Sequence, residues 1–407
     1  MVCAAMTGPM RDLSQYAIGC GVALRASPHL YTQTDTEHFD AVVAGGGIVG
    51  TACASELVRA GLRVALIEPS VIGGGATAAG MGHLAVMDDS EAQFALTRYS
   101  QLLWKELALR LSPDAEYFPC GALWVAADDR EMAEVERKQG FYQAREVPAK
   151  TLDRRALEAA EPNLREGLSG GLLLPDDAVV YPPCAARFLA EEAIASGMQL
   201  IEGRSVTELS DTAVQLDDGT SIASALTIVA TGIMAARLTP GLRIQPRKGH
   251  LAITDRYPAF LGHQLIELGY LKSAHSLDSD SVAFNAQPRR TGQILIGSSR
   301  QYGTHSPDVE PHMLEAMLRR AVEYMPALAD FRVIRCWTGF RAATPDKLPL
   351  IGPCPGFRNV FLATGHEGLG ISTSLATARL LADLILGRAS VIPLDPYLPE
   401  REFALHA

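Results

Sequence analysis

The stretch that decides the fold runs from Phe39 to Ser70 and reads FDAVVAGGGIVGTACASELVRAGLRVALIEPS. It opens with a short apolar run, Phe39–Ala44, which predicts a buried strand. A helix is expected from about Ile48 to Ala60, where a glycine follows and ends it. A second strand is expected over Arg63–Ile67. The order strand, helix, strand predicts a βαβ unit.

The turn between the first strand and the helix carries the pattern G-x-G-x-x-G, and an acidic residue follows the last glycine by 18 positions. Glycines allow a tight turn and let the backbone approach a pyrophosphate, which the helix N-terminus attracts. The acidic residue can accept hydrogen bonds from an adenosine ribose. We therefore expect dinucleotide binding by Gly45, Gly47, Ile48, Val49, Gly50 and Glu68.

A second loop of small residues, IGGGATAAGMGHL, covers Ile72–Leu84. Simple nicotinamide enzymes have no obvious need for such a loop, whereas a bulky tricyclic ring lying against the backbone would need one. His83 is a candidate to face that ring, with a hydrogen-bonded structural histidine as the alternative. The residues of this loop expected to bind the cofactor are Thr77, Ala78, Gly80, Met81 and Gly82.

The C-terminal part repeats the strand, loop and helix order. A strand over Val360–Ala363 leads into a glycine-rich loop and then a helix that Ser372, Thr373 or Ser374 can cap. Free N–H groups at the start of this helix could stabilise the negative charge that a flavin ring gains on reduction.

Composition excludes several function classes. The chain has 407 residues and a formal net charge of −10, which disfavours nucleic-acid binding. Its seven cysteines form no C-x-x-C pair, which argues against zinc or an iron–sulfur cluster. No metal-binding residues are expected. The longest apolar run, Ile222–Ala236, is too short and too interrupted to span a bilayer. A reduced, cytoplasmic protein is expected, with peripheral attachment at the inner membrane face as the alternative.

Residues 1–37 lack a convincing secretory pattern, and we expect a flexible N-terminal extension, with a transit peptide as the alternative.

Two later segments carry candidate substrate contacts. In the strand SVAFNAQP, alternation places Ala283, Asn285 and Gln287 on one face, which suits either substrate contacts or solvent. In WTGFRAATPDKLPLIG, Arg341 lies among apolar residues, so its guanidinium needs a carboxylate from the protein or from a substrate.

Together, these motifs resemble the FAD-dependent D-amino-acid oxidase family, which includes glycine oxidase and sarcosine oxidase. The resemblance covers about residues 38–400 and rests on the fingerprint, GATAAGMGHL, IVATG, WTGFRAATPDKLPLIG and ATGHEGLGI. The last two resemble D-hydroxyproline dehydrogenases, opine dehydrogenase β subunits and hydrogen cyanide synthase subunits. The resemblance implies an α/β fold with a Rossmann-like FAD-binding domain of discontinuous segments, 38–115, 176–236 and 336–400. An α+β substrate domain with a large mixed β-sheet would comprise 116–175 and 237–335.

The resemblance also implies site residues. Arg341 matches an arginine that binds the substrate carboxylate in bidentate fashion, with a structural salt bridge to Asp346 or another acid as the alternative. A tyrosine that helps to hold the carboxylate in glycine oxidase falls at Asn285, which puts glycine itself in doubt. The positions of covalent flavin attachment fall at Gly339 and Thr77, so noncovalent FAD is expected. Further cofactor contacts are expected from Val206, Thr231, Gly232, Gly365, His366, Glu367, Gly368, Leu369, Gly370 and Ile371.

The implied reaction is oxidation of an amino- or imino-acid C–N bond by hydride transfer to flavin N5, which gives an imine. D-Hydroxyproline is the favoured substrate. The alternatives are an octopine or nopaline dehydrogenase subunit, and a glycine, sarcosine or D-amino-acid oxidase that produces hydrogen peroxide. A non-catalytic flavin-bearing subunit and a nicotinamide-dependent dehydrogenase come from other classes.

No catalytic base is assigned, because His83, His250 and His366 are candidates only through their nearness to the motifs. Oxygen, a quinone or a carrier protein could reoxidise the flavin. The expected partners are therefore the substrate and this acceptor, together with further copies of the chain or partner subunits.

Overall fold

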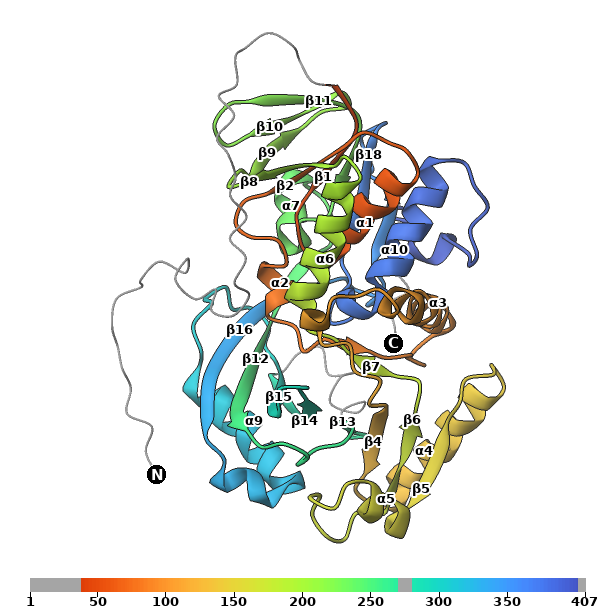
Figure 1. The fold of residues 1–407 in the computed structure, drawn as a ribbon, viewed down its shortest axis with the longest axis vertical. Coiled ribbons are helices and arrows are strands. Elements are labelled where there is room, and N and C mark those ends of the chain that lie inside the picture. The colour runs from red at the N-terminus through yellow and green to blue at the C-terminus, as the bar shows by residue number, and fades with distance from the viewer. Residues whose placement is uncertain (1–37, 270–279, 402–407) are drawn as a thin grey trace. The chain divides into compact units, whose positions relative to one another are not determined.

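The structure is a computed structural model that describes residues 38–269 and 280–401. These residues belong to one unit of the chain and are arranged around two large sheets (Figure 1). The predicted N-terminal extension lies outside the described residues.

The first sheet forms around the βαβ unit predicted from the fingerprint. Strands β1 (His38–Ala44) and β2 (Val64–Glu68) are parallel neighbours, and α1 (Ile48–Arg59) connects them. The sheet order is β17-β18-β11-β1-β2-β8, with a hairpin attached to β11. The remaining strands are β8 (Gln199–Glu202), β9 (Val206–Leu209), β10 (Ala213–Leu216), β11 (Ser221–Val229), β17 (Leu350–Pro353) and β18 (Val360–Thr364).

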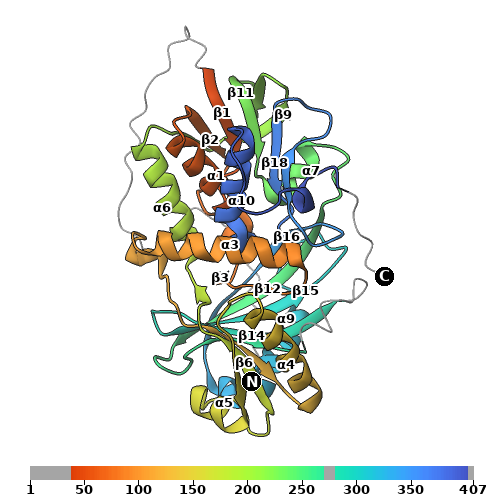
Figure 2. The same cartoon turned by 90° about the vertical axis from the view of Figure 1, so that its right-hand side faces the viewer.

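Helices cover the first sheet and bury its apolar side chains. Figure 1 shows α1 beside α6 (Pro182–Ala195) and α10 (Gly370–Ile385), and the three share one hydrophobic cluster. Helix α3 (Glu91–Ala108) crosses near one end of α6 and α10 (Figure 2). The Trp104 indole N–H donates to the Ile371 carbonyl oxygen, which ties α3 to the first turn of α10.

The second sheet has the order β16-β12-β15-β14-β13-β4-β6-β5. It is mixed, because β13 and β4 are parallel while its other neighbours are antiparallel. Its strands are β4 (Ala122–Ala126), β5 (Lys150–Asp153), β6 (Gly170–Leu174), β12 (Gln245–Arg256), β13 (Gln264–Glu267), β14 (Ser281–Pro288), β15 (Gln293–Arg300) and β16 (Val333–Ala343). The predicted fold class, a Rossmann-like part plus a large mixed sheet, is therefore confirmed.

Different helices pack against the two faces of the second sheet. Alternate side chains such as Phe284 and Ala286 pack against α9 (Pro311–Tyr324) and α5 (Arg154–Ala160). On the other face, α4 (Asp129–Gln143) covers Trp124 and its neighbours. Shorter elements are α2 (Gly75–Ala78), α7 (Ala235–Leu238), β3 (His83–Leu84) and β7 (Ala178–Val179).

Two details differ from the sequence-based expectations. Helix α10 begins at Gly370, and its N-cap Leu369 has no side-chain cap, so the expected capping by a hydroxyl is wrong. The reason is that Ser372 lies within the first turn, where its hydroxyl instead donates to the carbonyl oxygen of His83. The domain boundaries stay a prediction, although β16, most of which was assigned to the FAD-binding domain, pairs with β12 in the second sheet.

Candidate functional site

The glycine turn after β1 is closed against the end of β11. Gly45 has a φ of +106°, and a Cβ placed on it would lie 2.6 Å from the carbonyl oxygen of Ala230. A Cβ on Gly50 would overlap the carbonyl oxygen of Gly45. Only glycine satisfies both contacts without moving the backbone, so the fingerprint residues form the narrow turn that a pyrophosphate-binding loop requires.

The second glycine loop is fixed to the start of α1. Gly47 is the N-cap of α1 and supplies no side-chain cap. The Ile48 N–H donates to Thr77 Oγ1 at 3.0 Å, so a residue of the second loop caps this helix instead. The loop predicted to face a flavin is thereby held beside the loop predicted to hold the pyrophosphate.

Glu68 ends β2 with its carboxylate turned back towards the glycine turn. Its two oxygens accept the N–H groups of Gly46 at 2.7 Å and Ser70 at 3.0 Å. The pKa of the Glu68 carboxyl is raised above its ordinary value, chiefly by burial and also by nearby Glu202. The two backbone hydrogen bonds oppose this shift by lowering the pKa. Val206 begins β9, three residues beyond the Gly203 N–H that donates to the Glu68 carbonyl. This arrangement fits the ribose end of a dinucleotide.

The loop before α10 meets both glycine loops. A Cβ on Gly80 would lie 2.5 Å from Ile371 Cδ1, and one on Gly370 would lie 3.9 Å from Val49 Cγ2. A Cβ on Gly339 of β16 would overlap the methyl group of Ala79. Three loops that are far apart in the sequence and one strand of the second sheet therefore meet at one place.

Buried polar atoms at this place fit a bound cofactor. Within the described ranges, neither Thr231 Oγ1 nor His83 Nε2 has a hydrogen-bond partner, although both atoms are buried. Gly232 has a φ of +57°, and its carbonyl oxygen accepts the Thr364 hydroxyl at 3.0 Å. A buried polar atom without a partner is costly. Together with the glycine cradle, these atoms show that the residues present suit FAD.

The three candidate histidines differ in their surroundings. His83 lies in β3, and burial lowers its pKa to about 3, so its ring is neutral at ordinary pH. His366 Nε2 contacts Thr377 Oγ1 at 3.0 Å, and burial lowers its pKa to about 3. Its ring is therefore engaged by α10.

His250 is engaged on the α9 side of the second sheet. Its Nδ1 contacts Ser299 Oγ at 2.9 Å, and its Nε2 accepts the Glu310 N–H at 3.0 Å. Burial, followed by the charge of nearby Lys248, lowers its pKa to about 4. Because both ring nitrogens are occupied, His250 holds the start of α9 and is a poor candidate for a base.

Arg341 belongs to β16, the edge strand of the second sheet, and its side chain extends over the neighbouring strand β12. A Cβ on Gly249 would lie 2.7 Å from both terminal guanidinium nitrogens of Arg341, so the neighbouring strand offers bare backbone beneath the cation. One of these nitrogens donates to the Ser299 carbonyl oxygen at 3.0 Å. A Cβ on Gly368 would lie 3.6 Å from Arg341 Nε, so the loop before α10 is directly beside it.

The predicted alternative for Arg341 was a salt bridge with Asp346 or another acid. The structure gives Asp346 a different partner, Arg401, whose guanidinium donates to both carboxylate oxygens at 2.7 and 2.9 Å. The alternative is therefore wrong for Asp346, because that carboxylate is already held in bidentate fashion by another arginine. A salt bridge of Arg341 with another acid stays a prediction.

Asn285 lies on the same face of the second sheet as Arg341, which we call the Arg341 face. Its neighbours in β14, Phe284 and Ala286, point to the α9 side, so Asn285 points to the other. Asn285 is paired with Gly297, and a Cβ on Gly297 would contact Met81 Sδ and Leu251 Cδ2 at 2.8 and 2.9 Å.

The polar side chains of β14 are buried. Asn285 is 8% exposed and Gln287 is 1% exposed, so the alternative of a solvent-facing strand is wrong. In the part of the chain that the structure describes, the amide oxygens of both side chains lack hydrogen-bond partners. Hydrogen-bonding capacity is therefore available on the Arg341 face.

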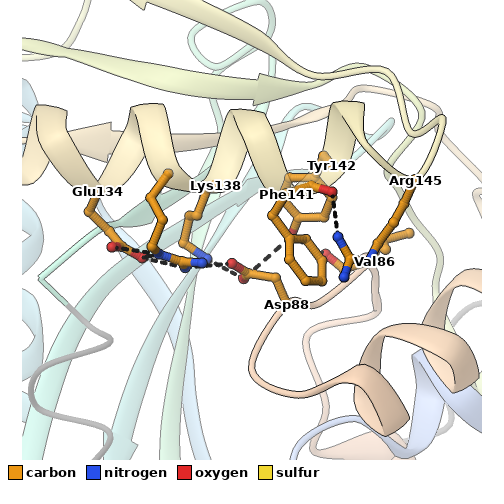
Figure 3. Close-up of polar contacts among 8 residues, drawn as sticks. Val86, Asp88, Glu134, Lys138, Phe141, Tyr142 and Arg145 are labelled. Carbon is orange, nitrogen blue, oxygen red and sulfur yellow. Dashed lines mark hydrogen bonds and ion pairs between the residues drawn. The ribbon is translucent and has the colours of Figure 1, made fainter.

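Sequence reasoning missed the segment that follows His83. Asp88 and Lys138 form a buried ion pair, their side chains 2% and 1% exposed, and the Tyr142 hydroxyl donates to the Val86 carbonyl oxygen (Figure 3). The Lys138 ammonium also lies 4.7 Å from the centre of the Trp124 ring. These contacts fasten the segment carrying His83 to α4. An Asp and a Lys that are 50 residues apart gave no sequence signal.

The fold and site define a flavin-binding oxidoreductase in which a dinucleotide cradle faces an arginine on a second sheet. The chain belongs to the DAO family (FAD dependent oxidoreductase), which it matches over residues 40–384. This membership confirms FAD as the cofactor and confirms an enzyme that oxidises amino C–N donors.

Several relatives support this assignment. Glycine oxidase of Pseudomonas aeruginosa is 30% identical over 88% of this chain and 98% of its own length. The bifunctional protein ThiO/ThiG of Nostoc sp. is 32% identical, and this chain spans 54% of that protein. The crystal structure of glycine oxidase from Geobacillus kaustophilus superposes with a TM-score of 0.81 and 27% identity, covering 90% of this chain and all of that one.

No helix in the two described ranges combines the length and apolarity needed to cross a membrane.

Proposed function

We propose that this enzyme oxidises a small amino or imino acid whose carboxylate is bound by Arg341. The observation that supports the proposal most strongly is the position of the guanidinium, laid over the bare backbone of Gly249 and beside Gly368. A planar cation in a fixed orientation suits bidentate binding of a carboxylate.

When bound, FAD supplies a hydride acceptor for the carbon next to the substrate nitrogen. The chain's own residues then act mainly by position. Arg341 fixes the acid end of the substrate, and the glycine loops fix the cofactor, so the reacting groups are held together. The N-terminus of α10 favours negative charge near the loop before it. No base is required among the histidines, and the neutral His83 ring is a neighbour rather than a proton carrier.

We favour D-hydroxyproline as the substrate. The Asn285 amide oxygen is buried on the Arg341 face and lacks a partner within residues 38–269 and 280–401, so it suits a hydroxyl donor on the substrate. Glycine is the second candidate, because four of the relatives are named glycine oxidase and each is matched over at least 97% of its length. An assembly with partner subunits is a further candidate, because one relative, at 27% identity, is the hydrogen cyanide synthase subunit HcnC of Pseudomonas protegens.

Three further proposals complete this account. FAD is bound noncovalently, because Gly339 has no side chain and Thr77 Oγ1 accepts the Ile48 N–H. The two sheets correspond to the FAD-binding and substrate domains. The protein works in the cytoplasm, and oxygen, a quinone or a carrier protein reoxidises the flavin.

The proposal is tested by anaerobic reduction of the enzyme-bound flavin with D-hydroxyproline, D-proline, glycine and octopine, followed by loss of yellow colour. D-Hydroxyproline should bleach the flavin at the lowest concentration. In Arg341→Met the half-saturating concentration should rise about 100-fold, because a charge-assisted contact worth roughly 2–5 kcal/mol is lost. Arg289→Met, which breaks a separate ion pair with Glu116, is the control and should change it by less than about threefold.

An unchanged half-saturating concentration in Arg341→Met would overturn the role of the arginine. Bleaching by glycine or octopine but not by D-hydroxyproline would overturn the favoured substrate alone. Peroxide measured after admission of air separates an oxidase from a dehydrogenase.

A further inference from the structure

A second arginine lies beside Arg341. Arg247 of β12 is directly opposite Arg341 of β16 in the antiparallel register, so both side chains belong to the Arg341 face. Arg247 is only 4% exposed. Like charges placed opposite each other on a sheet repel, and burial of one of them strengthens the repulsion. This pair therefore requires a compensating negative charge nearby.

Glu367 supplies that charge. Its carboxylate forms an ion pair with Arg247, and the two side chains are 9% and 5% exposed. The other side of the Arg247 guanidinium donates to the Tyr302 hydroxyl at 3.3 Å. Arg247 is thus held between an acid and a phenol, and it holds the carboxylate of Glu367 in return.

The backbone of Glu367 is fastened next to Arg341. Its N–H donates to the carbonyl oxygen of Ala342, the residue after Arg341, at 2.8 Å. Its φ of +51° is unusual for a residue with a side chain. The following residue, Gly368, lies against Arg341. A carboxylate anchored here has two guanidinium groups as neighbours, and it forms its ion pair with Arg247.

We infer that Arg247 is a positioning residue that holds Glu367 away from Arg341, so that Arg341 receives the carboxylate of the substrate. The inference rests on the proposed function. With substrate bound, the charges alternate: Arg247, Glu367, Arg341 and the incoming acid. Without Arg247, the same glutamate becomes an internal competitor for Arg341.

The test measures binding of cyclopentanecarboxylate to the oxidised holoenzyme through the change in flavin absorbance. This probe carries a ring and a carboxylate but no nitrogen to oxidise, and cyclopentanecarboxamide is its neutral counterpart. Arg247→Met should weaken the carboxylate about 10-fold or more, since a nearby anion then competes for Arg341. The neutral amide should change by less than about twofold.

The glutamate variant should act in the opposite direction. Glu367→Gln should bind the carboxylate as tightly as the wild type or more tightly, and Arg247→Met combined with Glu367→Gln should recover most of the lost affinity. A pair that merely stabilises the fold would weaken binding in both single variants, and the double variant would not recover. Arg289→Met, with the ion pair to Glu116 removed, controls for general loss of stability.

Equal weakening by Arg247→Met and Glu367→Gln would overturn the inference, as would an unchanged affinity in Arg247→Met. If Arg341→Met also left the affinity for cyclopentanecarboxylate unchanged, the proposed function itself would fail. If Arg341→Met weakened binding and Arg247→Met did not, only the positioning role would fail. When Arg247→Met yields too little folded protein, Glu367→Gln and the double variant still decide the sign.

Discussion

Replacement of Gly45 by alanine tests the glycine turn that is proposed to hold the pyrophosphate. The added Cβ would lie 2.6 Å from the carbonyl oxygen and 2.9 Å from the carbonyl carbon of Ala230, both of them backbone atoms that cannot rotate away. The φ of +106° adds strain for a residue with a side chain. Strain of about 1–2 kcal/mol and overpacking of about 1–3 kcal/mol together give about 3 kcal/mol.

Because the turn must open to relieve this contact, the substitution should weaken FAD binding. A cost of about 3 kcal/mol corresponds to about 100-fold in affinity, at 1.4 kcal/mol per factor of ten. The assay is titration of apoprotein with FAD, followed by quenching of flavin fluorescence. Gly61→Ala is the matched control, since Gly61 has a similar φ of +89° but no heavy atom within 4 Å of the added Cβ. It should lower stability by about 1 kcal/mol and leave FAD affinity unchanged. Equal FAD affinity in Gly45→Ala and wild type would refute the reasoning.

Three further predictions concern the buried polar groups. Lys138→Met should destabilise the fold by about 1–3 kcal/mol in urea unfolding, because Arg137 still contacts Asp88, and adding Asp88→Asn should recover part of it, whereas an additive loss would contradict a buried pair. Burial lowers the pKa of His250 and His366 to about 4 and about 3, below the ordinary 6.5, so the unfolded chain takes up protons first as pH falls. The contribution of each histidine to the free energy of unfolding is full above about pH 6.5 and should fall by about 1–2 kcal/mol at pH 5. Urea unfolding curves that coincide at pH 7 and pH 5 would refute this prediction. Asn285→Leu should reduce the preference for D-hydroxyproline over D-proline about 10-fold in kcat/KM, and an unchanged ratio would remove its role.

Local patterns were sufficient to predict the dinucleotide half of the fold. The apolar run, the glycine spacing and the acid at Glu68 act within 32 consecutive residues, so the βαβ unit needs no distant partner. The helix start at Gly370 was misplaced, because hydroxyl residues just inside a helix give the same local signal as a cap. There, the Ser372 hydroxyl donates to His83 of the second glycine loop, a tertiary contact that local sequence does not encode.

The Arg341 surroundings could be predicted only in part. Burial cost indicates that an arginine among apolar residues needs a partner, but the choice of partner depends on sheet register. The register places Gly249 under the guanidinium and Arg247 beside it. The pairing of Arg247 with Glu367 joins residues 120 positions apart, and no periodicity in either segment points to it.

The most direct test of the central claim is a crystal structure of the FAD-loaded enzyme soaked with cyclopentanecarboxylate. We predict that both carboxylate oxygens will accept hydrogen bonds from the Arg341 guanidinium at about 2.7–2.9 Å, with the ring of the ligand directed along the Arg341 face towards Asn285. A carboxylate bound elsewhere, with the Arg341 guanidinium paired to an acidic side chain of the protein, would contradict the account.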